Sequence, residues 1–224
     1  MFAEKGEIFY RFLTVEDKDD VINLLANNFC IEEPICKCLN FSEKERYEYA
    51  TYASMFLADN RSMGAFDVNN SEKLCGVMIN SASDFDPGIN MEDYLQSVSK
   101  NTQYSIRVDN FLHKRIKELT KDGHFFACNW LSMDAAYFGK GIAKNLTLRT
   151  NEWLKNSRQF DMWVGVSVAP NAKHIGEKDG LKSVLEINMS EYQDEKTGER
   201  IFANAQIPLL HILIKAVKST KSNL

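Results

Sequence analysis

The pattern of hydrophobic and polar positions predicts a strand and two helices at the start of the chain. Residues 7–13 combine aromatic and branched side chains, which is typical of a strand. Thr14 suits the N-cap of a first helix, and Ser42 with Glu45 three residues later forms the capping box of a second helix that runs to about Ala58. Residues 29–39, which surround Pro34, are predicted to form a loop.

The middle of the chain predicts a hairpin followed by an amphipathic helix. Residues 62–68 and 74–81 read as strands on either side of a short polar turn. Residues 84–108 are predicted to be a loop with a short helix. From residue 109 to about residue 121 the chain predicts a helix with Lys and Arg on one side and a hydrophobic side made of Phe111, Leu112, Ile116 and Leu119.

The second half of the chain alternates between strands and helices. Residues 125–133 form an apolar run of buried-strand length, residues 134–141 a loop with two glycines, and residues 141–155 a helix. A strand at 162–168, a weak helix at 171–178 and two closing strands at 181–190 and 207–214 follow, the last two joined by a hydrophilic hairpin. A helix that crosses between buried strands predicts an α/β fold: one domain over residues 1–224, with a mixed sheet flanked by helices on both faces.

Size and charge restrict the class of protein. A chain of 224 residues buries most of one domain's surface in a single core. The formal net charge of −4 gives no electrostatic reason to expect a nucleic acid partner, and it slightly favours a cationic substrate. No apolar run has the length of a signal peptide or a membrane span, so we expect a cytoplasmic protein without a membrane partner.

The cysteines suggest packing rather than chemistry. There are five of them, an odd number, which fits reduced and mostly buried thiols. Cys36 and Cys38 form a close pair, but no second pair accompanies them, and a zinc site needs about four converging ligands. We therefore expect no metal.

The most informative segment is the turn between the strand at 125–133 and the following helix. The first N–H groups of a helix have no partner within the helix, and with the helix dipole they suit a diphosphate. Gly139 and Gly141 remove Cβ atoms that would keep phosphate oxygens away from the backbone. The segment lacks the spacing of a P-loop or of a dinucleotide fingerprint, and a turn that needs glycine only for its backbone angles is the alternative.

This segment, LSMDAAYFGKGIAKNLTLRTNEWLK, resembles the acetyl-CoA-binding motif of the GNAT acyltransferase superfamily. Gly141 and Ala143 match the last two motif positions, whereas Phe138 stands where Arg or Gln is usual, and Lys140 and Lys144 are candidates to supply the missing charge. The resemblance implies acetyl-CoA, or another short acyl-CoA, as co-substrate. It also implies that the coenzyme contacts Leu131, Ser132, Met133, Phe138, Gly139, Lys140, Gly141, Ile142, Ala143 and Lys144.

A second resemblance concerns the segment NFCIEEP, which is similar to the acidic-Pro segment of the invertebrate arylalkylamine N-acetyltransferase-like branch. In that branch the Glu directly before Pro is the general base, which implies Glu33 here. The implied activity is transfer of the acyl group to the primary amine of a small molecule, such as an arylalkylamine, in one ternary complex. The alternative is that Glu33 only caps a turn beside Pro34; we expect Glu32 to face solvent.

The general acid of such a reaction has no clear candidate. Gly176 occupies the place of the superfamily's Tyr, and Val168 and Ala172 occupy those of the branch's serines, although Ser167 and His174 lie nearby. Two alternatives therefore remain, a non-catalytic acyl-CoA-binding protein on the same fold and an enzyme for a polyamine, amino sugar or protein N-terminus. An aromatic group suits either an acceptor pocket or the core; it consists of Tyr47, Tyr49, Tyr52 and Phe56.

Overall fold

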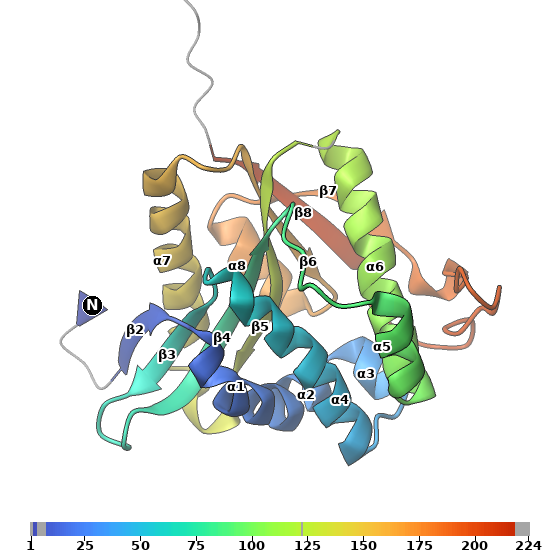
Figure 1. Cartoon of the computed structure of the whole chain (residues 1–224). Coiled ribbons are helices and arrows are strands. Elements are labelled where there is room, and N and C mark those ends of the chain that lie inside the picture. The colour runs from blue at the N-terminus through green and yellow to red at the C-terminus, as the bar shows by residue number, and fades with distance from the viewer. Residues whose placement is uncertain (1, 4–7, 122, 218–224) are drawn as a thin grey trace, which may run out of the picture.

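The computed structural model describes residues 2–3, 8–121 and 123–217, and its centre is an eight-stranded sheet (Figure 1). The strand order is β1-β2-β3-β4-β5-β6-β8-β7. β5 and β6 pair in parallel and the other neighbours are antiparallel, which confirms the predicted mixed sheet. Glu7, part of the first predicted strand, lies outside the described residues. The strands are β1 (Phe2–Ala3), β2 (Ile8–Phe12), β3 (Met63–Asp67), β4 (Lys73–Ala82), β5 (Phe125–Met133), β6 (Met162–Ser167), β7 (Lys182–Ile187) and β8 (Leu210–Ala216).

Helices cover both faces of the sheet (Figure 1). Because successive strand residues point to opposite faces, Val77 and Ile79 pack with the helices of the N-terminal half, whereas Met78 between them packs with Leu146 of α7. One layer holds α1 (Lys18–Leu24), a π-helical turn (Leu25–Phe29), α2 (Cys30–Glu32), α3 (Pro34–Cys38), α4 (Glu43–Ser54), α5 (Met91–Ser97) and α6 (Lys100–Thr120). The other layer holds α7 (Ile142–Ser157) and α8 (Pro170–Lys178).

The sheet divides between β5 and β6. The parallel pairing runs from Phe125 with Met162 to Cys128 with Gly165, and β5 then continues to Met133 while it stays paired with β4. On the β4 side, Ile79 pairs with Trp130 and Asn80 with Cys128, so Asn129 is an extra residue. Such a bulge bends its strand. β6 meanwhile follows β8 to Ser167, and a wedge opens between the two strand ends.

Two predictions about helices need correction. The loop predicted at residues 29–39 is wrong, because α2 and α3 occupy this segment with Pro34 as the first residue of α3. At that position proline loses no hydrogen bond. The helix predicted from residue 109 begins earlier, at Lys100. The predicted N-caps are confirmed, since Thr14 and Ser42 both accept hydrogen bonds from the helices that follow them.

Candidate functional site

The wedge between β5 and β6 opens into a cavity of about 450 Å³. Its walls include the free end of β5 and residues 165–169 at the end of β6. On one side of the sheet, which we call the α4 side, the wall comes from α3, α4 and α6; on the other, the α8 side, it comes from α7, α8 and β8. The cavity is therefore reached by side chains from both helical layers.

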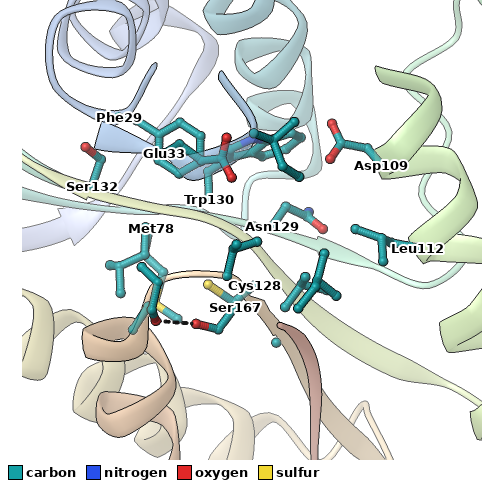
Figure 2. A pocket seen from close by; sticks show the side chains of 18 of the residues that line it. Phe29, Glu33, Met78, Asp109, Leu112, Cys128, Asn129, Trp130, Ser132 and Ser167 are labelled. Atoms are coloured by element: carbon teal, nitrogen blue, oxygen red, sulfur yellow. Dashed lines mark hydrogen bonds between the residues drawn. The ribbon is translucent and has the colours of Figure 1, made fainter. Parts of the chain in front are cut away.

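Glu33 lies on the α4 side, at the junction of α2 and α3 (Figure 2). Its extended backbone (φ −68°, ψ 127°) ends one helix and begins the next. The Cys36 amide donates a hydrogen bond of 2.7 Å to its Oε2, so Glu33 caps α3 and also lines the cavity. Burial raises the pKa of Glu33 above its ordinary 4.5, and the Cys36 amide opposes the shift. Glu32 beside it is exposed and pairs with Lys37 at 2.6 Å, as expected.

Asp109 is a site residue that the sequence analysis missed. It lines the cavity from α6, and Figure 2 shows its carboxylate facing that of Glu33. The Tyr49 hydroxyl donates to Asp109 Oδ2 at 2.8 Å, and Trp130 Nε1 donates to the Tyr49 oxygen at 3.2 Å. Burial raises the pKa of Asp109 to about 8; the Tyr49 hydrogen bond opposes this, and the Glu33 charge adds to it. The sequence signal was its spacing from Leu112 and Ile116, which places a carboxylate on the helix's hydrophobic side.

The aromatic side chains of α4 are both core and cavity wall. Tyr49 and Tyr52 are buried, yet both line the cavity together with Phe56. They surround the indole of Trp130, with ring centroids 5.2 to 6.2 Å from it. Tyr47 points elsewhere and donates a hydrogen bond of 3.3 Å to Asn23. Three of the four members of this aromatic group thus pack in or against the core and also line the cavity.

The glycine turn before α7 keeps the start of that helix open. Gly139 and Gly141 have φ angles of 79° and 75°, in the left-handed region that favours glycine, and no atom lies within 4 Å of a Cβ built on either. No side chain caps the first turn of α7. Lys140 and Lys144 are exposed beside this turn. The loop therefore has room for a ligand at a set of backbone N–H groups.

Hydrogen bonds hold this turn in place. The Tyr137 hydroxyl donates to Asp67 at 2.7 Å, and Lys73 pairs with Asp134 at 2.6 Å, so the first half of the turn is tied to the β3–β4 hairpin. The amide of Ala135 also donates to the side chain of Asn28, close to the segment that contains Glu33. The turn is thus fixed relative to both walls of the cavity.

The other residues predicted to contact a coenzyme fall into two groups. Leu131, Ser132, Met133 and Phe138 line the cavity, and the Phe138 side chain is 59% exposed. Ile142 and Ala143 are the first two residues of α7, and their side chains are buried. Only their main-chain groups are therefore open to a ligand.

The positions considered for a general acid carry no free hydroxyl. Val168, Ala172 and Gly176 line the cavity. Ser167 also lines it, but its hydroxyl donates to the carbonyl of Ala169 at 2.8 Å (Figure 2). His174 is exposed on α8.

The Cys128 thiol borders the cavity, and burial raises its pKa to about 12. A protonated thiol suits packing rather than nucleophilic attack.

Two further searches cover residues 2–3, 8–121 and 123–217. In this part of the chain, no three His, Cys, Asp or Glu side chains gather where they could hold a metal ion. Likewise, none of the helices described there combines the length and hydrophobicity of a membrane span.

Comparisons with known proteins identify the fold. No protein-family model matches the sequence, and no curated protein matches it. Solved structures do match. Arylalkylamine N-acetyltransferase 2 from Aedes aegypti is 24% identical, with a TM-score of 0.73 over 95% of this chain and 100% of that chain. The mosquito arylalkylamine N-acetyltransferase-like 5b is 18% identical, with a TM-score of 0.76 over 93% and 99%.

A third similar structure is the polyamine N-acetyltransferase of Drosophila melanogaster, an enzyme that catalyses formation of N-acetylagmatine. It is 9% identical, with a TM-score of 0.69 over 93% of this chain and 99% of that one. Similarity at such identities is evidence of a shared fold. The chain therefore has the GNAT N-acetyltransferase fold, and within it resembles the arylalkylamine N-acetyltransferases of insects.

Proposed function

We propose that the protein is an acyl-CoA-dependent N-acyltransferase, which moves an acetyl or other short acyl group to the primary amine of a small molecule. The observation that supports this most is the single cavity that reaches both layers through the wedge between β5 and β6. A thioester and an amine that enter from different sides of the sheet would meet in it.

The coenzyme would lie along the free end of β5. Beyond Cys128 the edge of β5 that faces β6 has no strand partner among the described residues, so main-chain groups of Leu131 and Met133 are available to the amides of a pantetheine arm. The diphosphate would sit at the open first turn of α7, where backbone N–H groups and the helix dipole favour an anion. Lys140 and Lys144 supply positive charge at the same end.

Glu33 would be the general base. A protonated amine cannot attack a thioester, so Glu33 first takes a proton from the ammonium group. The amine nitrogen then forms a bond to the thioester carbon, and the carbon–sulfur bond breaks. A backbone N–H of β5 stabilises the oxyanion that forms between these steps. The coenzyme leaves as a thiolate. The nitrogen loses a second proton as the amide forms, and this proton balances the one that the thiolate takes up; no side chain is assigned to carry it, because Ser167 already donates to Ala169.

Arylalkylamines are the acceptor class that we propose first. The aromatic wall made by Tyr52, Phe56 and Trp130 supports them, as does the likeness of segment NFCIEEP to that branch. Polyamines, amino sugars and protein N-termini are the acceptors to compare with them.

The test is an acyl-transfer assay on the purified protein with acetyl-CoA and a panel of these amines. We expect thiol release with at least one amine, matched mole for mole by the N-acetylated amine in a mass spectrum. Binding of acetyl-CoA without thiol release from any amine would contradict the proposal and favour a non-catalytic acyl-CoA-binding protein.

A further inference from the structure

Acidic side chains gather on the cavity wall. Three carboxylates line the cavity, from Glu32 at the exposed edge and from Glu33 and Asp109 inside. Among the described residues that line it there is no Lys or Arg. Glu33 and Asp109 come from different elements and face one another (Figure 2), so a ligand between them meets an acceptor of hydrogen bonds at each end.

Asp109 is held in a fixed orientation by neutral groups. Tyr49 donates to its Oδ2, and Tyr49 is held in turn by Trp130. This arrangement leaves Oδ1 for a ligand. Tyr49 and Trp130 are 5% and 4% exposed, so packing in the core holds both rings in place.

The carboxyl group of Asp109 has no Lys or Arg beside it among the described residues that line the cavity. Burying a carboxylate without a cation or a full set of hydrogen bonds is unfavourable, and burial raises the pKa of Asp109 to about 8. A ligand that donates a hydrogen bond to Oδ1, above all a cationic one, would stabilise the ionised form.

We propose that Asp109 determines acceptor specificity, because its Oδ1 accepts a hydrogen bond from a second donor group at the end of the acceptor remote from the reacting nitrogen. The donor is an ammonium or a hydroxyl group. The inference rests on the proposed function, since it assumes that Glu33 receives the reacting amine.

Matched acceptor pairs test this role. Tyramine carries a hydroxyl group that phenylethylamine lacks, and cadaverine carries an ammonium group that pentylamine lacks. We expect the wild-type protein to prefer the donor-bearing member of one pair by roughly 10- to 100-fold in kcat/KM, the usual strength of a hydrogen bond to a charged group. The preferred pair identifies the donor. Asp109→Asn keeps the shape and one acceptor oxygen, and should reduce the preference to a few-fold.

Two further variants accompany Asp109→Asn. Asp93→Asn is the matched control, because it removes an exposed carboxylate on α5 and should leave the preference unchanged. Tyr49→Phe removes the hydrogen bond that orients Asp109 and should weaken the preference, whereas general damage to the fold would lower the turnover of both amines equally. Thermal melting curves of all variants accompany the kinetics.

Equal losses for both members of a pair, or a preference that survives Asp109→Asn, would overturn the inference. Calorimetric titration of the same amines gives a readout without turnover. If no amine is acylated but the donor-bearing amine binds more tightly in an Asp109-dependent way, the proposed function fails and the binding role of Asp109 stands. If amines are acylated but neither pair shows a preference for its donor-bearing member, the proposed function stands and the role of Asp109 in specificity fails.

Discussion

Glu33 combines a structural contact with a place on the cavity wall. One of its oxygens accepts from the Cys36 amide and caps α3, and its carboxylate faces the cavity. The capping amide stabilises the charged form, but burial outweighs it and raises the pKa. A carboxyl group whose pKa is raised in this way is a stronger proton acceptor once it is ionised.

Replacing this carboxylate separates the two roles. Glu33→Gln keeps an oxygen that can accept from Cys36, so we expect the fold and coenzyme affinity to persist. Turnover should fall by roughly two to four orders of magnitude, the usual contribution of a general base. Steady-state kinetics measure this, with the adjacent exposed Glu32→Gln as the matched control. Unchanged turnover in Glu33→Gln would remove Glu33 from the role.

Asp109 makes stability depend on pH. Its folded pKa of about 8 exceeds the ordinary value of 3.8, so the folded protein keeps this proton where the unfolded chain has lost it. The stabilisation from neutral Asp109 is complete below about pH 4 and is lost as the pH rises to about 8. The groups that act on it are Tyr49 of α4, through a hydrogen bond, and Glu33 before α3, through its charge.

Asp109→Asn removes this titration. We expect the variant to gain stability over wild type as the pH rises from about 4 to about 8, by about 1.4 kcal/mol for each pH unit. Chemical denaturation at several pH values measures the free energy of unfolding. A difference that does not change over this range would show that Asp109 titrates normally, and Asp93→Asn should show no such trend.

Sequence identified one of the two internal carboxylates, for a physical reason. Glu33 stands in a short motif beside Pro34, whereas Asp109 carries no motif. The predicted helix began at residue 109, and a carboxylate in the first turn of a helix is ordinary. The helix in fact begins at Lys100, so Asp109 lies in its interior, where its side chain faces the cavity.

At the level of elements, local signals were sufficient for most strands and helices. Capping boxes and apolar runs predicted α4, β5 and α7 within a few residues. The loop prediction for residues 29–39 is wrong because it treats Pro34 as a helix breaker. Proline is favourable at the first position of a helix, and Pro34 takes that position in α3. The wedge between β5 and β6 could not be predicted from the sequence, because it depends on pairing between distant strands and on the bulge at Asn129.

The glycine turn before α7 leads to a prediction about coenzyme binding. Gly141→Val places a β-branched residue at φ 75° and a side chain over the open N–H groups. We expect coenzyme affinity to fall at least tenfold, measured by fluorescence of Trp130 and Trp163, which both line the cavity.

The matched control is Gly198→Val. Gly198 has a similar φ of 71° and open surroundings, but it lies between β7 and β8 and does not line the cavity. It therefore reports the cost of backbone strain alone. If Gly141→Val kept wild-type affinity, the diphosphate would not bind at this turn.

At the scale of the whole molecule, the fold places two walls of the cavity on opposite faces of one sheet. The N-terminal helices contribute the carboxylates, and the glycine turn and α8 border the other side. The parting of β5 and β6 joins them. An amine and a thioester would therefore react directly, without a covalent acyl-enzyme intermediate. The protonated thiol of Cys128 is consistent with this, because it is a poor nucleophile.

The proposed function requires that the wedge between β5 and β6 binds an acyl-CoA. Calorimetric titration of the whole protein with acetyl-CoA, and then with longer short-chain thioesters, tests it most directly. The account predicts saturable binding of one coenzyme per chain for at least one of them. Absence of binding by every thioester in the series would contradict it.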